Sequence, residues 1–294
     1  MVRHELSVLI PTFNDECFQL VSCLKEQLQQ HDACWEIIVA DDGSTCLDVI
    51  KINRNIRNFQ HCYYLERQQN TGRAAIRNFL AQQAKYEWLL FLDSDMKISS
   101  TFIQNYLYCQ DADVIDGGIK IKAVSLRDNL RYLHEKRIEK SHTLEYRRKN
   151  PYQDFHTANF LIRKKVLLEC PFDERFVSYG YEDVLLGKVL QEKKKAIIHI
   201  ENPALFDIFE SNASFVSKTE EGLRTLHRFK DELKTHSHML TKIEILRHTL
   251  PLPLIRMWHR LLGRLERRLL IGKYPNLRIF DLYRLGYYLC IKED

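Results

Sequence analysis

The sequence predicts an α/β protein with a largely parallel sheet, and three observations carry this prediction. Short, mostly apolar runs recur between residues 6 and 92, with the length of strands buried on both faces. Segments with helical spacing separate these runs, which favours parallel strands joined by right-handed crossovers. Polar or acidic residues follow the runs directly, and a parallel sheet gathers such positions at one edge.

The first part of the chain alternates strands and helices. Residues 6–11, apolar except for Ser7, predict a buried strand closed by Pro11, which cannot donate to a sheet ladder. Residues 16–30 follow with apolar positions at helical spacing, and Asn14 or Asp15 is the candidate N-cap. The remaining predicted elements here are strands 36–40, 61–65 and 88–92 and a helix that opens at 70–73 and ends near 85.

After the last of these strands the pattern changes. The chain predicts one or two strands in 112–122, a charged helical segment over 124–149, a strand over 155–162, a helix to about 193 and a short strand over 196–200. From residue 214 onward the pattern is helical almost to the end, broken by Pro251, Pro253 and Pro275. The order of the strands in the sheet cannot be read from these patterns.

Composition is ordinary for a globular protein, with 45% hydrophobic and 28% charged residues. The eight cysteines are scattered without a Cys-x-x-Cys pair, so we expect neither a zinc site nor a disulfide framework. With no signal peptide and no apolar run of membrane-spanning length, we expect a cytoplasmic protein. The net charge of +5 resides in residues 241–294, which hold 11 Lys/Arg against 5 Asp/Glu, while residues 1–240 hold 33 against 34.

Two acids, Asp93 and Asp95, follow the strand at 88–92 with one residue between them. Carboxylates so close repel each other unless a cation neutralises them, and hard oxygen ligands suit Mg²⁺ or Mn²⁺. The alternative is a plain solvated turn, because Asp and Ser favour turns. Arg73, at a predicted helix start, adds a guanidinium to free N–H groups that bind phosphate. Together they predict a site for a nucleotide diphosphate and a metal.

Four segments in this order resemble family 2 glycosyltransferases. They are Ser7 to Asn14, Ile37 to Ser44 (ending Asp41-Asp42-Gly43-Ser44), Asn70 to Asn78, and Asp93-Ser94-Asp95. A fifth, Phe172 to Phe176 followed by Gly180-Tyr181-Glu182-Asp183, is similar to the Gly-x-Glu-Asp segment of galactosyl- and N-acetylhexosaminyl-transferring relatives. The resemblance implies the GT-A (nucleotide-diphospho-sugar transferase) fold, a Rossmann-like mixed sheet. We expect a catalytic domain over residues 1–215 and a C-terminal helical extension over 216–294.

The resemblance also implies roles for the donor side. Asp42 would accept a hydrogen bond from the base of a nucleotide-sugar donor, which we expect to be UDP-linked. Arg73 would lie near the base or the pyrophosphate, and Asp93 near the ribose or the metal. Asp95 would hold Mn²⁺ or Mg²⁺. The residues expected to line the nucleoside pocket are Pro11, Thr12 and Asn14.

On the acceptor side, the resemblance implies that Asp183 is the general base that takes a proton from the attacking hydroxyl, with inversion at the anomeric carbon. Tyr181 and Glu182 would bind the acceptor, a glycan or a lipid-linked oligosaccharide. The alternative for Glu182 and Asp183 is a pair of acids stabilised by a helix dipole. Relatives often add a metal-binding histidine; here Phe206 stands where we expect it, which leaves His199 as the candidate third ligand or as a core residue.

The segment 254–269 reads as an amphipathic helix. Its apolar face holds Leu254, Trp258, Leu261, Leu262, Leu265 and Leu269, and arginines lie largely off that face. Such a helix either contacts the inner face of the cell membrane peripherally or packs its leucines on the catalytic domain. Nucleic acid is not an expected partner, because no aromatic-interleaved basic motif accompanies the charge.

Three functions remain open at this point. The leading one is an inverting, metal-dependent glycosyltransferase of polysaccharide biosynthesis. The second is a nucleotidyltransferase, but such enzymes usually carry a Gly-rich basic segment after the first strand, where this chain has Pro11-Thr12-Phe13-Asn14. The third is a nucleotide-sugar-binding protein without turnover, which the missing metal histidine keeps open.

Overall fold

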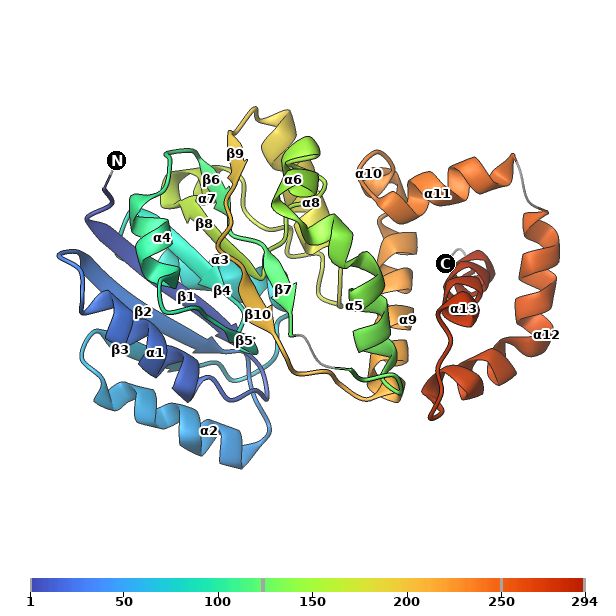
Figure 1. Ribbon diagram of the computed structural model, residues 1–294, viewed down its shortest axis with the longest axis horizontal. Coiled ribbons are helices and arrows are strands. Elements are labelled where there is room, and N and C mark those ends of the chain that lie inside the picture. Colours follow the sequence, from blue (N-terminus) through green and yellow to red (C-terminus); the bar gives the residue numbers. More distant parts are fainter. Residues whose placement is uncertain (1, 123–124, 249–250, 293–294) are drawn as a thin grey trace.

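The computed structural model describes residues 2–122, 125–248 and 251–292. Its centre is a seven-stranded sheet with helices on both faces (Figure 1). The strand order is β3-β2-β1-β4-β8-β6-β9, and β8 alone in this sheet runs antiparallel to its neighbours. The strands are β1 Glu5–Thr12, β2 Cys34–Asp41, β3 Cys62–Glu66, β4 Trp88–Leu92, β6 Val114–Asp116, β8 Asn159–Arg163 and β9 Ile197–His199. The sheet is therefore mixed, as predicted.

A smaller sheet lies beyond the end of β4. Its order is β5 (Met96–Lys97), β10 (Ala204–Phe206) and β7 (Ile119–Ile121). The sequence did not predict β10, because three residues are too few to show a period. The strand predicted over 155–162 begins later, at Asn159, and Phe155 is a buried loop residue.

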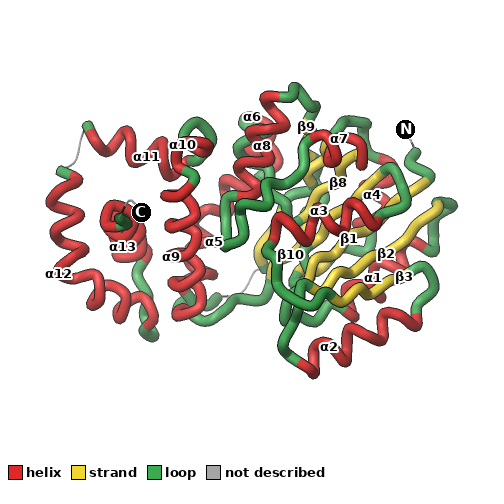
Figure 2. The backbone as a smooth tube through the Cα atoms, turned by 180° about the vertical axis from the view of Figure 1, so that it is seen from behind, coloured by secondary structure: helices red, strands yellow, loops and turns green. Residues whose placement is uncertain are grey.

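Successive residues of β1 point to opposite faces, which divides the core into two layers. Val8 joins a cluster with α1 and α4, while Leu9 joins a cluster with α3, α7 and α8. Figure 1 shows α1 and α4 over one face, and Figure 2 shows α3 over the other. The helices of this part are α1 Phe18–Leu28, α2 Leu47–Asn53, α3 Arg73–Gln83, α4 Phe102–Tyr108, α5 Leu130–Ile138, α6 Leu144–Lys149, α7 Lys164–Glu169 and α8 Glu182–Glu192, with 3-10 turns η1 Arg54–Asn58 and η2 Glu139–His142.

The predicted charged helical segment over 124–149 is interrupted. It divides into α5, η2 and α6, and residue 124, where it was predicted to begin, lies outside the described residues. Its face lies over the site rather than away from it, since Arg131, His134 and Glu135 of α5 line a pocket described below.

The C-terminal helices are α9 Asn212–Arg228, α10 Lys230–Leu233, α11 His238–Arg247, α12 Leu252–Ile271 and α13 Leu277–Cys290. The predicted boundary after residue 215 falls inside α9. Leu223 of this helix joins the sheet-side core, while Phe215 packs with Leu270 and Phe280 of the later helices. Within the described ranges, no helix is both long and apolar enough to cross a membrane.

Candidate active site

Two pockets meet at the carboxyl ends of β1, β2 and β4. The first, called here the strand-end pocket, has a volume of about 520 Å³, and the second, the helix-side pocket, about 410 Å³. Both volumes suit a small-molecule ligand. The residues that line both are Arg73, Asp93, Asp95, Tyr179, Glu210 and Lys218. The two pockets are therefore halves of one site, joined at the acids that follow β4.

Most of the predicted donor residues line the strand-end pocket, namely Pro11, Thr12, Asp42, Arg73, Asp93 and Asp95. The register of the parallel strands explains this, because Thr12 lies opposite Asp41. Asn14 was expected with them but is not among the residues that line this pocket. Its backbone is left-handed (φ 54°), and its side-chain oxygen accepts hydrogen bonds from the backbone N–H groups of Thr45 and Cys46 at 2.8 and 2.9 Å. It ties the β1 loop to the β2 loop instead.

Asp42 is buried and anchors the loop that opens α3. Its Oδ2 accepts hydrogen bonds from the backbone N–H groups of Thr71 and Gly72, both at 3.0 Å, and its Oδ1 accepts one from the Thr71 hydroxyl at 2.9 Å. Arg67 lies 3.6 Å from Oδ1. Both oxygens of this carboxylate therefore already accept hydrogen bonds from the loop, although the residue also lines the pocket.

The N-terminus of α3 places a cation, Arg73, at the site. Gly72, at the N-cap, has φ 91°, and a Cβ there would lie 2.6 Å from the carbonyl oxygen of Val177. The Arg73 guanidinium lies 4.7 Å from the centroid of the Tyr179 ring. Burial works against its charge, but the carboxylate of Glu182, with Tyr179 and the acids after β4, raises the pKa of Arg73. It stays cationic where a phosphate group would bind.

The negative charge of the acids after β4 is only partly compensated by nearby arginines. Asp93 accepts a hydrogen bond from Arg77 at 2.7 Å. Asp95 has no such partner among the ion pairs of the described residues, and burial, together with Asp93 and Asp15, raises the pKa of Asp95 to about 6. A hard divalent cation would relieve the repulsion between Asp93 and Asp95. Their carboxylate oxygens are ligands that suit Mg²⁺ or Mn²⁺. Among the described residues no three His, Cys, Asp or Glu side chains converge on one metal position. Two carboxylates with donor phosphates match the usual Mg²⁺ coordination.

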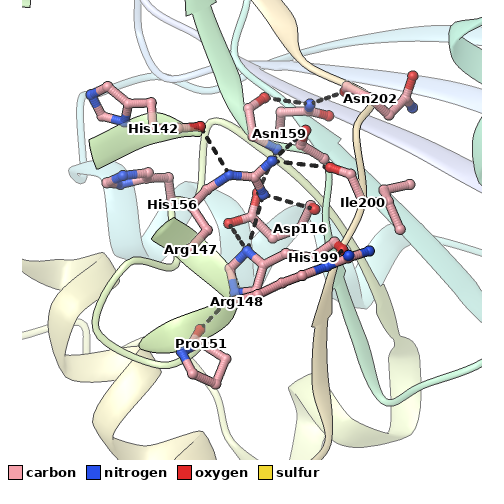
Figure 3. Close-up of polar contacts among 12 residues, drawn as sticks. Asp116, His142, Arg147, Arg148, Pro151, His156, Asn159, His199, Ile200 and Asn202 are labelled. Atoms are coloured by element: carbon pink, nitrogen blue, oxygen red, sulfur yellow. Dashed lines mark hydrogen bonds and ion pairs between the residues drawn. The ribbon is translucent and has the colours of Figure 1, made fainter. Parts of the chain in front are cut away.

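The structure places His199 in the core, which is the second of the two expectations for this residue. Its Nδ1 lies 3.0 Å from Nη1 of Arg147 and 3.2 Å from Oδ2 of Asp116, and its Nε2 lies 3.0 Å from the carbonyl oxygen of Pro151 (Figure 3). The side chain is buried in the sheet and lines neither pocket. Phe206, where a histidine was expected, does line the helix-side pocket, so an apolar ring occupies that position.

The predicted acceptor residues Tyr181 and Glu182 line the helix-side pocket, as does Asp183. Gly180 has φ 95° and Tyr181 φ 70°, so the turn into α8 is left-handed at two successive residues. A left-handed non-glycine residue is costly, and such strain clusters at functional sites. Glu182 is buried 3.7 Å from Nη1 of Arg77, and burial, together with Asp183, raises its pKa.

Asp183 faces a histidine that sequence reasoning missed. Its Oδ1 accepts a hydrogen bond from the backbone N–H of Val184 at 2.8 Å, and its Oδ2 lies 3.9 Å from Nδ1 of His156. Burial opposes the charges of both groups, but each favours the other's charged form: the pKa of Asp183 is lowered and that of His156 is raised. The carboxylate is thereby kept ionised, as a general base requires.

Three more residues at the site were not predicted. Phe13 lines the strand-end pocket with 45% of its surface exposed, and Asp15 lines it with a buried Oδ2 that has no hydrogen-bond partner among the described residues. His142 lines the helix-side pocket, where burial and the neighbouring His156 lower its pKa to about 4. Only Phe13 had a sequence signal, an aromatic ring directly after a strand that ends at the site.

Residues 7–170 match the family model described as Glycosyl transferase family 2. A chondroitin synthase of Escherichia coli is 27% identical over 219 residues, which cover 62% of this chain and 31% of that protein. An uncharacterized glycosyltransferase of Haemophilus influenzae is 31% identical over 105 residues, or 35% of this chain and 40% of that protein. The chain thus spans less than half the length of these relatives.

Solved structures of S. aureus TarS are similar in fold. The crystal structure of TarS 1-349 has a TM-score of 0.51 and 18% identity, with 96% of this chain and 90% of that chain covered. The same segment in complex with UDP-GlcNAc has a TM-score of 0.50 and 17% identity, with 97% and 89% covered. At these identities the similarity concerns the fold alone, and it confirms the predicted GT-A architecture.

Proposed function

Because this chain belongs to glycosyltransferase family 2, we propose that it transfers a hexose or N-acetylhexosamine from a UDP-sugar to a hydroxyl group, with inversion. The acceptor class is a glycan or a lipid-linked oligosaccharide. The observation that carries this proposal is the junction of the two pockets at Asp93, Asp95 and Arg73. A donor in the strand-end pocket would present its anomeric carbon to an acceptor in the helix-side pocket.

The donor side offers a group for each part of UDP. The exposed ring of Phe13 suits stacking on the base, and the unpartnered Oδ2 of Asp15 suits a ribose hydroxyl. Arg73 and the N–H groups at the start of α3 suit the pyrophosphate. The choice of UDP is also supported by the TarS complex with UDP-GlcNAc.

Asp93 and Asp95 are the residues that would hold Mn²⁺ or Mg²⁺. Bound there, the ion would offset the charge that develops on the departing diphosphate. Arg77 keeps Asp93 oriented through the 2.7 Å contact, and it reaches Glu182 on the acceptor side. This arginine links the two halves of the site.

Asp183 is the general base of the transfer step. An acceptor hydroxyl attacks the anomeric carbon while the bond from that carbon to the diphosphate oxygen breaks, and the hydroxyl proton passes to the Asp183 carboxylate. His156 keeps that carboxylate ionised before attack. Attack from the face opposite the leaving group inverts the configuration. Glu182, buried beside the base, orients acceptor hydroxyls.

A non-catalytic nucleotide-sugar-binding protein is the second candidate, and the specific observation in its favour is Phe206 in place of a metal-binding histidine. The test is to incubate the purified chain with a panel of UDP-sugars with and without Mn²⁺ and to measure released UDP. Turnover of one donor that requires the ion supports the glycosyltransferase. Saturable UDP binding, measured by thermal shift, without any UDP release would leave the binding protein as the better description.

A further inference from the structure

The outer face of α12 is apolar and open to solvent. Six large apolar side chains of this helix are about half exposed or more: Leu254 56%, Met257 54%, Trp258 48%, Leu261 75%, Leu265 51% and Leu269 48%. At about 100° per residue they fall within one stripe roughly 120° wide. Scattered apolar residues are normal on a surface, but a continuous stripe marks an interaction site. We call these six residues the outer stripe.

The opposite side of the same helix is well packed, so the outer stripe is not a displaced core face. Leu270 is fully buried and joins Phe280 of α13 in a cluster. Glu266 is buried and pairs with Nδ1 of His259 at 2.8 Å. Arg267 holds Glu220 of α9 at 2.8 Å. As Figure 1 shows, α12 curves around α13 at the end of the molecule away from β1, β2 and β3, so its outer side faces outward.

A row of cations borders the outer stripe. The exposed arginines at four-residue spacing are Arg256, Arg260, Arg264 and Arg268. No carboxylate among the described residues forms an ion pair with any of them. The sole acid in the sequence of α12 is Glu266, which is turned inward. The surface therefore combines an apolar stripe with uncompensated positive charge.

We propose that α12 docks in the plane of an anionic lipid bilayer, with the outer stripe at the acyl boundary and the arginine row on lipid phosphates. Trp258 and arginines beside leucines are the composition of such interfacial helices. A second copy of this chain fits less well, because its own outer stripe would bring further arginines and no carboxylate to meet them. The sequence left membrane contact and core packing open; the exposure of five of its six apolar residues supports the membrane.

Membrane docking also bears on the acceptor, and that part of the inference rests on the proposed function. α9 and α13, against which α12 packs, also line the helix-side pocket through Phe215 and Phe280. A docked α12 would hold that pocket near the bilayer, where a lipid-linked acceptor resides. Membrane docking itself needs neither donor nor metal, so the two proposals can fail separately.

The test is cosedimentation of the full chain with vesicles of phosphatidylcholine alone and of phosphatidylcholine mixed with phosphatidylglycerol. We expect binding to the anionic vesicles only, weakened by salt. The double variant Leu261→Glu/Leu265→Glu should lose binding by more than about tenfold. Arg260→Gln/Arg264→Gln should weaken binding about 30-fold, because each arginine near an anionic lipid surface contributes about 1 kcal/mol of attraction. The matched control is Leu47→Glu/Leu168→Glu, which changes leucines that are 79% and 54% exposed elsewhere and should bind like wild type.

Melting temperature and UDP binding of each variant show whether the fold and the donor site are intact. The proposal is overturned if the wild-type protein does not bind anionic vesicles. It is also overturned if the variant Leu261→Glu/Leu265→Glu binds them as well as wild type does. Light scattering provides the remaining outcome: a wild-type dimer that the outer-stripe variant converts to monomer would assign this face to a second copy instead.

Discussion

Nδ1 of His156 lies 3.9 Å from Oδ2 of Asp183, and each group moves the pKa of the other towards its charged form. His156 comes from the loop before β8, and Asp183 comes from the first turn of α8. Their contact places a cation beside Oδ2 of the proposed base, while Oδ1 accepts a hydrogen bond from the backbone N–H of Val184. This relationship gives the site a defined dependence on pH.

Replacing His156 with Asn should move the acid limb of the kcat profile to higher pH. The sign follows from the lowered pKa of Asp183: without the histidine, burial is no longer offset, and the carboxylate takes up its proton at a higher pH. A pH–rate series on the variant and on His4→Asn, a surface control, measures the shift. Coincident profiles for His156→Asn and wild type would show that the histidine does not set the protonation of the base.

Asp95→Asn should weaken Mn²⁺-dependent UDP binding by about 1–3 kcal/mol, because the change keeps the shape of the side chain but removes a charged oxygen ligand. UDP titration with and without Mn²⁺ measures the effect, and Asp32→Asn at an exposed position is the control. Unchanged Mn²⁺ dependence in the Asp95 variant would remove this residue from the metal site.

Truncating Phe13 should mainly lower UDP affinity, whereas truncating Asp42 should mainly lower the stability of the fold. Phe13→Ala removes an exposed ring, so UDP affinity should fall by about 1–3 kcal/mol with little change in stability. Asp42→Ala leaves the N–H groups of Thr71 and Gly72 without their acceptor, so stability should fall by about 1–3 kcal/mol. Urea unfolding and UDP titration on both variants separate the two effects. A stable Asp42→Ala protein that has lost only UDP binding would restore the base-reading role first expected of Asp42.

Arg77→Met should cost about 3–5 kcal/mol of stability, because it leaves two acids near a buried position without their cation. Arg77 is 2% exposed and contacts both Asp93 and Glu182. Adding Glu182→Gln should recover part of the lost stability, since it removes one of the two negative charges that Arg77 no longer neutralises. Urea denaturation of both proteins decides this, and a single-variant loss below about 1 kcal/mol would argue against a linking role for Arg77.

The fold and much of the site were predictable because their signals are local. The apolar runs of β1, β2 and β4 end directly at Thr12, Asp41 and Asp93, so a parallel sheet gathers them whatever the remaining chain does. Asp183 could be placed for the same reason, since its segment opens a helix with a recognisable motif.

What the sequence could not predict are contacts between distant segments. His199 lies in a short strand, and no local pattern shows that its ring nitrogens are taken by Arg147 and Pro151. His156 could not be assigned from sequence because its meeting with Asp183 depends on how the loop before β8 packs against α8. The exposure of Leu261 likewise depends on which face of α12 the helix α13 covers.

The most direct test of the account is the rate of sugar transfer by Asp183→Asn, measured as UDP release with the donor and acceptor that wild type uses. Asn preserves the size of the side chain but cannot take the proton from the acceptor hydroxyl. We predict a fall of roughly 10²–10⁴-fold with UDP affinity nearly unchanged and a product of inverted anomeric configuration by NMR in wild type. Transfer by Asp183→Asn at the wild-type rate, or a retained configuration, would contradict Asp183 as the base of a single displacement.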